Sequence, residues 1–157
     1  MLAPDRPPVD PASLYILDFE VRKEGWSAYA LDDGNKIRAR AMLVSVRGQH
    51  PTPQKGDVII PETTVTVKVD SPPNRRGPKG SNPTPEELAD PKSHGGEEVD
   101  VSNSNEPWND YRIVGGPLKV RMKLVLNRVW RIRERFDVVG DPVYVVNFSI
   151  NTTIEQQ

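Results

Sequence analysis

A polar, proline-rich tract from Asp70 to Asp110 interrupts a chain that otherwise carries β-strand patterns. Six prolines lie among Gly, Asn, Ser and charged residues between positions 72 and 91, and this composition is too polar and too broken for a core element. We therefore predict a long acidic, Pro-rich loop over 70–110 within a single β domain, residues 13–157. Residues 1–12 contain four further prolines and are predicted to form a flexible arm.

Period-two alternation and turn residues mark the strands on either side of the tract. Asp33-Gly34 separates the runs 26–31 and 36–46, and an Asp-Gly pair between two such runs favours a tight antiparallel hairpin. The longest β-patterned stretch is 118–136, with a bulge or bend expected near Asn127, and 143–154 supplies the last strand. An amphipathic helix over 120–135 is the alternative, although the β-branched residues there favour a strand.

These patterns together predict an all-β fold, a small antiparallel β-barrel or sandwich built as a meander. Inside the tract, Thr84-Pro85 followed by two glutamates predicts one helical turn, because Thr caps helices and Pro favours the first helical position. Trp108 stands among polar residues further along the tract. We read it as an anchor that holds the tract to the domain, or alternatively as a partner contact.

Two regions of opposite charge lie close together in the sequence. Seven Lys or Arg and one acid fall between positions 118 and 136, whereas 85–110 holds eight acids and a single Lys. The net charge of −1 therefore hides two opposed regions, which either screen each other within the fold or meet a partner.

Alternating basic residues on two predicted strands form a candidate face for single-stranded nucleic acid, with an aromatic ring to stack bases. The alternative reading is a solvated face whose charges pair with the acidic tract and protect sheet edges. The residues of this candidate face are Lys36, Arg38, Arg40, Lys119, Arg121, Lys123 and Trp130.

Motifs for catalysis and for metal or cofactor binding are not found. The chain has no Cys and only two His, so it offers neither thiolate chemistry nor a typical zinc ligand set. Asp32-Asp33-Gly34-Asn35 lacks the further spaced ligands of a calcium loop and reads as a hairpin turn. We predict no catalytic residue, no metal site and no cofactor, and no motif identifies a family.

The sequence favours a non-catalytic interaction or assembly protein that uses its arm and its long loop to contact a protein partner or further copies of itself. A single-stranded nucleic-acid-binding small β-barrel is the alternative, and an enzyme with an unrecognised site is the third possibility. Neither an export signal nor a membrane-spanning apolar run is visible in the sequence, so a cytoplasmic protein without a membrane partner is expected.

Overall fold

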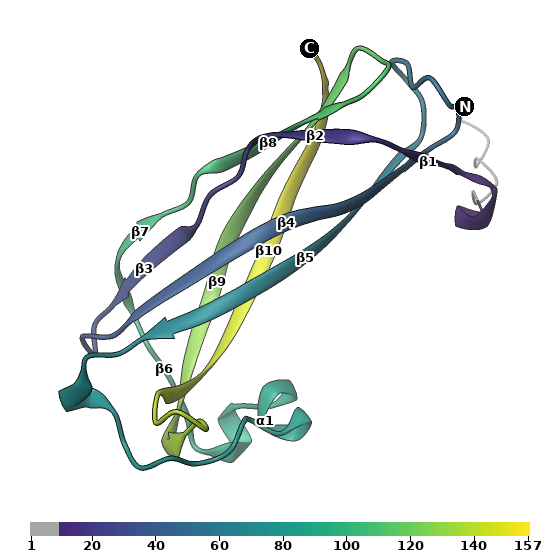
Figure 1. Ribbon diagram of the computed structural model, residues 1–157. Coiled ribbons are helices and arrows are strands. Elements are labelled where there is room, and N and C mark those ends of the chain that lie inside the picture. The colour runs from purple at the N-terminus through teal and green to yellow at the C-terminus, as the bar shows by residue number, and fades with distance from the viewer. Residues whose placement is uncertain (1–9) are drawn as a thin grey trace, which may run out of the picture.

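The computed structural model describes residues 10–157 of the 157-residue chain, and its regular structure is almost entirely β (Figure 1). Residues 1–9 of the predicted arm lie outside the described residues. The strands are β1 (Tyr15–Leu17), β2 (Phe19–Lys23), β3 (Ser27–Leu31), β4 (Lys36–Gly48), β5 (Ile59–Asp70), β6 (Gly96–Glu98), β7 (Val101–Asn105), β8 (Trp108–Ile113), β9 (Leu118–Phe136) and β10 (Pro142–Gln156). The remaining elements are one helix, α1 (Pro85–Ala89), and three 3-10 turns, η1 (Pro11–Ser13), η2 (Pro73–Arg75) and η3 (Lys92–His94). The predicted all-β class is confirmed.

The strands form two antiparallel sheets, each organised around one long strand. In the first sheet, β4 pairs with β5 on one side and with β1 and β3 on the other, and β7 extends the sheet beyond β3. In the second sheet, β9 pairs with β10 on one side and with β8 and β6 on the other, and β2 follows β8. Neither sheet closes into a barrel within residues 10–157.

The inner faces of the two sheets share one hydrophobic core. Alternate residues of the central strands β4 and β9 supply its middle, as the period-two pattern requires, because successive strand side chains point to opposite faces. Each of these side chains is at most 2% exposed, and they are Ile37, Ala39, Ala41, Val120, Met122 and Leu124. Burial of apolar side chains such as these is the main favourable contribution to folding.

The strand order departs from a simple meander because the chain crosses repeatedly between the sheets. Consecutive strands pair only in the hairpins β3–β4, β4–β5, β8–β9 and β9–β10. The chain passes from one sheet to the other five times: between β1 and β2, β2 and β3, β5 and β6, β6 and β7, and β7 and β8. The predicted loop over 70–110 needs a correction, since β6, β7 and the start of β8 lie inside it. Their polar residues are accommodated because β7 is an exposed edge strand.

Three local predictions are confirmed by the structure. The Asp33-Gly34 turn joins β3 to β4 in an antiparallel hairpin, and Gly34 has the positive φ of 88° that favours glycine there. Thr84 and Glu87 form a complete capping box at the start of α1. In β9, Asn127 is the extra residue of a bulge, because Asn147 pairs with Arg128 and the next residue of β10 pairs with Leu126.

A polar network ties the β3–β4 turn of the first sheet to β10 of the second. The Tyr144 hydroxyl donates to Asp33, and the Asn35 amide nitrogen donates to the same hydroxyl at 2.7 Å. Arg131 Nη1 reaches the Asp33 carboxylate at 3.1 Å. The Asp33 carboxylate therefore holds the two sheets together, which supports the interpretation of this segment as a hairpin turn.

Candidate functional site

The seven residues of the predicted nucleic-acid face do not form one surface. The triad Lys36, Arg38 and Arg40 lies in β4, on the outer face of the first sheet, because the intervening residues are buried in the core. The triad of residues 119, 121 and 123 lies on the outer face of the second sheet for the same reason. The shared core separates the two triads. Trp130 also lies in β9, seven residues beyond Lys123, or about 20 Å along the strand.

Most of these cations have an acidic partner within the chain. Arg38 pairs with Asp70 at 2.7 Å, and Arg40 contacts Glu24 through two nitrogens, at 3.0 and 2.7 Å. In the second triad the closest pairs are Arg121 with Asp110 at 2.8 Å and Lys119 with Glu155 at 3.7 Å. Such pairs on an outer face contribute little to stability, but they reduce the charge available to a phosphate backbone.

Two of the tryptophans already stack against these same cations. The guanidinium carbons of Arg38 and Arg40 lie 5.1 and 5.8 Å from the centre of the Trp26 ring. Trp108 lies at the start of β8, with Arg121 at 4.7 Å and Lys123 at 5.8 Å from its ring centre. Trp108 is thus part of the second sheet, and these two cation–π contacts are made with side chains of β9.

Arg135, near the end of β9, holds the part of the tract around α1, which forms no strand pairs. Arg135 donates from Nε and Nη2 to the two carboxylate oxygens of Glu87, both at 2.8 Å. The same guanidinium reaches the carbonyl oxygens of Ser81 and Asn82 at 3.3 and 3.2 Å. Glu87 also accepts from the Thr84 backbone N–H at 2.9 Å. The hydrogen bonds from Arg135 and Thr84 lower the pKa of Glu87 to about 2.

Glycines allow the tract to pack backbone to backbone against the β9–β10 turn. Gly77 N–H donates to the Gly140 carbonyl at 2.9 Å, and Gly80 N–H donates to the Asp137 carbonyl at 2.8 Å. A Cβ atom on Gly80 would lie 2.1 Å from the backbone oxygen of Phe136, so any larger residue at this position would force one of the two backbone segments to move. These backbone contacts and the ion pair of Arg135 with Glu87 bring the acidic tract against the basic end of β9, so the two regions of opposite charge in the sequence meet within the fold.

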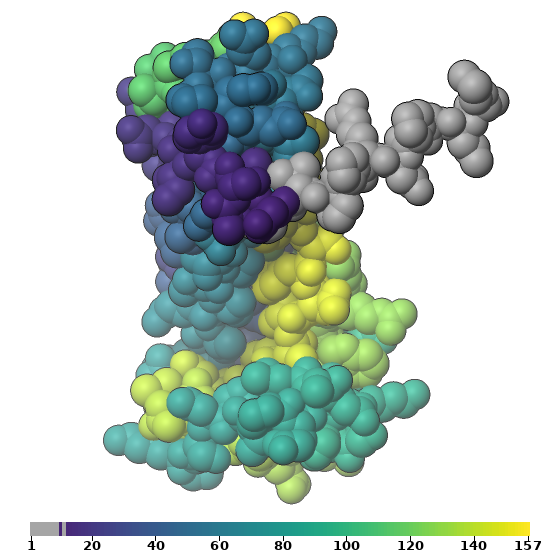
Figure 2. All heavy atoms as spheres, turned by 90° about the vertical axis from the view of Figure 1, so that its right-hand side faces the viewer, coloured from purple at the N-terminus to yellow at the C-terminus, as the bar shows by residue number. Residues whose placement is uncertain are grey.

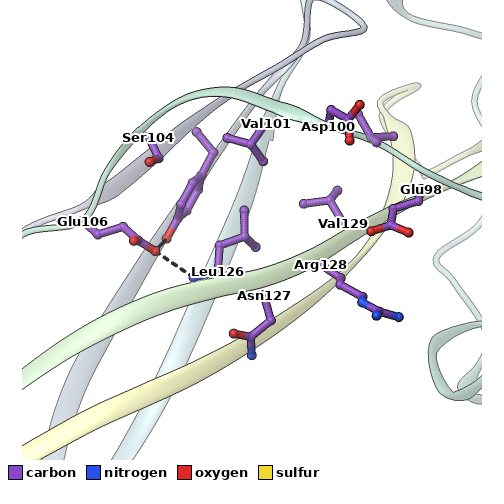
Figure 3. A pocket seen from close by; sticks show the side chains of 11 residues that line it. Glu98, Asp100, Val101, Ser104, Glu106, Leu126, Asn127, Arg128 and Val129 are labelled. Carbon is purple, nitrogen blue, oxygen red and sulfur yellow. Dashed lines mark hydrogen bonds between the residues drawn. The ribbon is translucent and has the colours of Figure 1, made fainter.

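A pocket of about 280 Å³ opens where the second sheet is incomplete (Figure 3). β8 pairs with β9 as far as Lys123 and β6 pairs with it from Trp130, so the stretch between them has no strand on that side. Glu106 occupies part of this gap: its Oε2 accepts from Leu126 N–H at 2.7 Å and from the Tyr29 hydroxyl at 2.8 Å. Burial and then the neighbouring carboxylate raise the pKa of Tyr29.

Glu106 in this pocket therefore acts as an internal acceptor that replaces a missing strand. Glu98, Asp100 and Arg128 lie further along the rim (Figure 3). Throughout residues 10–157, no group of three or more His, Cys, Asp or Glu has the arrangement of a metal site. The same part of the chain contains no helix that is long and apolar enough to cross a membrane. We assign no chemistry to the pocket.

The most unusual surface is the side where β5 and β10 lie next to each other, each at the edge of its sheet (Figure 2). Neither strand has a partner on its outer side within residues 10–157. Apolar residues on the inner faces of both strands are only partly covered, with Val67 43% and Ile154 38% exposed. We call this surface the seam, and its apolar residues are Val65, Val67 and Val69 of β5 with Phe148, Ile150 and Ile154 of β10.

Sequence reasoning placed the strands of the seam but missed the seam itself. The signal was available in part, because residues 143–154 contain no charge, no Pro and no Gly. What the sequence did not reveal is that β10 is an edge and that β5 lies beside it. Comparison of the chain with protein-family models, with curated proteins and with solved structures gave no match.

Proposed function

We propose that the protein is a non-catalytic interaction or assembly protein and that the seam is its docking surface. The observation that carries this proposal is that two long, unpaired edge strands lie side by side with incompletely covered apolar side chains between them. Backbone N–H and C=O groups along such edges are ready to pair with another strand. The proposed scaffold is an open β-sandwich, and the partner binds to its uncovered side.

Natural proteins usually protect an exposed sheet edge with charges, proline, bulges or short length. β5 follows this rule in part, since Pro61, Glu62 and Lys68 interrupt it. β10 is longer, at 15 residues, and its only charged residue is Glu155. An edge left open in this way is suited to strand addition, in which backbone hydrogen bonds supply affinity and alternate side chains supply specificity.

The tract and the arm have different parts in this proposal. The tract is bound to the β9–β10 turn, so it frames one end of the seam. The arm was expected to wrap a neighbouring subunit, and that expectation remains a proposal for residues 1–9. Residues 11–13 form η1, which lies on the same side of the molecule as the seam (Figure 2). A protein partner or a further copy of the chain would therefore meet η1 as well as the two edges.

Single-stranded nucleic-acid binding is less well supported, because it would use two separate basic faces whose charges are largely paired. An enzyme is also less well supported, since the pocket around Glu106 commits its central carboxylate to internal hydrogen bonds. Neither alternative accounts for the uncovered apolar residues of the seam.

Site-specific photo-crosslinking in the cells that produce the protein tests the proposal. A photoreactive residue in place of Asn151 on β10 or of Thr66 on β5 should give a discrete protein adduct, because both side chains are exposed on the outer faces of the two edge strands that border the seam. The control replaces Val21 in β2, which is 57% exposed at the opposite edge of the second sheet. If no discrete adduct forms at either seam position, or if Val21 gives the same adduct, the proposed function is wrong.

A further inference from the structure

We propose that β10 pairs antiparallel with β10 of a second copy of this chain about a two-fold axis, so that the second sheets of the two copies become continuous. This inference rests on the proposed function and names the partner. Of the two edges of the seam, β10 is the one that pairs, for reasons of charge, geometry and size.

Charge distinguishes β10 from the other edges of residues 10–157. A two-fold pairing places each residue opposite a residue of the same strand, so a strand of mixed charges easily brings like charges together. β2 carries Glu20, Arg22 and Lys23 within five residues. β7 is uncharged but only five residues long. β10 combines length with an uncharged stretch from Val143 to Ile154, which makes it compatible with itself.

The two-fold axis also places inner-face residues of β10 opposite inner-face residues of the second copy, and outer-face residues opposite outer-face residues. When two copies of a strand pair antiparallel about an axis perpendicular to the sheet, residues directly opposite each other lie on the same face of the sheet. The residue numbers of each opposite pair therefore have the same sum, and that sum is even. In a register centred on Ile150, Val146 faces Ile154 and Phe148 faces Thr152 on the inner side. Ser149 faces Asn151 on the outer side. The half-covered apolar side chains would thus cover one another across the axis.

Backbone geometry is suitable over the whole stretch. The bulge near the middle of the β9–β10 ladder has its extra residue, Asn127, in β9, so β10 itself stays regular from Tyr144 to Gln156. Pairing over 145–155 would form about ten backbone hydrogen bonds, which is the number found in a typical specific interface.

Other occupants of the β10 edge fit less well. Residues 1–9 include three prolines, which supply no N–H and therefore leave gaps in a ladder. β5 of a second copy has Pro61 and three charged residues. An unrelated extended peptide is compatible with the backbone, but nothing in the structure selects its side chains, whereas β10 matches itself on both faces.

The test is the oligomeric mass of the full chain, measured by sedimentation equilibrium over a range of concentrations. The wild type is expected to approach twice the chain mass of 17.6 kDa. The variant Ser149→Lys/Asn151→Lys brings lysines together on the outer face at the axis and should raise the dissociation constant at least about tenfold. The variant Ser149→Glu/Asn151→Glu should do the same. An equimolar mixture of the two variants should regain the double mass, because opposite charges then face each other.

A matched control carries the same charge at the other edge of the seam. Thr64→Lys/Thr66→Lys changes two exposed outer-face residues of β5 and should leave the dimer intact. Circular dichroism of each variant establishes that it is folded, and recovery of the dimer on mixing shows the same for the two β10 variants.

Three results overturn the inference. They are a wild type that stays monomeric up to about 1 mM, a dimer unaffected by either β10 variant, and a dimer lost only in the β5 control. A monomeric wild type together with a discrete crosslink from Asn151 to another protein would refute self-pairing while leaving the proposed function intact. A dimer that persists without any seam crosslink would contradict both proposals, since it would form through a different surface.

Discussion

Loss of the Glu87 charge should release the part of the tract around α1, and the structure allows the effect to be estimated. Glu87 is buried and makes two 2.8 Å contacts with Arg135, and its pKa falls from 4.5 to about 2. A difference of this size corresponds to about 3 kcal/mol at neutral pH. Because the Arg135 side chain is 26% exposed, solvent screening reduces the stabilisation expected from this ion pair to about 1–2 kcal/mol.

The expected effect of Glu87→Gln is therefore local. Helix α1 has five residues and would not persist without docking, so residues 81–95 should open together. Hydrogen exchange of these amides, corrected for intrinsic rates, should accelerate about tenfold, and tryptic cleavage after the exposed Lys79 and Lys92 should accelerate with it. The rest of the β domain should keep its protection.

The dependence on pH follows from the direction of the same pKa change. A carboxyl whose pKa is lowered by folding contributes its stabilisation above its unfolded value of 4.5, and the contribution disappears as the pH falls toward 2. Wild-type protection of the tract should decline over that interval, while the Glu87→Gln variant should be insensitive there. Glu86→Gln is the matched control, since Glu86 is exposed in the same turn. If the two variants behave alike, the assignment of the clamp is wrong.

Three further substitutions test the packing of the sheets and of the tract. Gly80→Ala should lower the melting temperature by about 4 °C, since the new methyl group would meet the Phe136 carbonyl. Asn109→Ala should cost about 2–3 kcal/mol in urea unfolding, because this buried amide makes hydrogen bonds to backbone groups of residues 25 and 41. Tyr29→Phe should cost about 1 kcal/mol in the same assay, since it removes one donor to Glu106.

Each of these substitutions has a control of the same chemistry at a position with fewer contacts. Gly25→Ala adds a methyl group whose nearest neighbour is an ordinary 3.7 Å away, and it should leave the melting temperature unchanged. Asn103→Ala removes an exposed amide of β7, and Tyr15→Phe removes a hydroxyl from a side chain that is half exposed. A control that matches its test variant would show that the stated contact does not carry the effect.

Sequence reasoning succeeded where the signal was local. The Asp33-Gly34 hairpin, the helical turn capped by Thr84 and the bulge near Asn127 each depend on residues within a few positions of one another. The central strands were equally visible, because alternation of Ile37 with charged neighbours is itself the record of a buried face.

What the sequence could not predict depends on contacts between distant segments. Nothing local joins Glu87 to Arg135, 48 positions away, although both were part of the charge regions that the sequence revealed. β6 and β7 escaped because polar edge strands lack a buried alternation and resemble loop sequence. The seam escaped for a related reason: whether β10 is a central strand or an edge is decided by the order of strands in the sheet.

The attachment of the tract gives the open side of the molecule a direction. At one end the chain runs from β5 through the tract to the β9–β10 turn, where Gly77 and Gly80 are hydrogen bonded, so the two sheets are strapped together there. At the other end β10 runs out to the C-terminus (Figure 1). A strand added along the seam would therefore meet the tract at the end where β10 begins. Two chains joined antiparallel along β10 would carry their tracts at opposite ends of the shared edge, and because each β10 edge is then paired, none is left for a third copy.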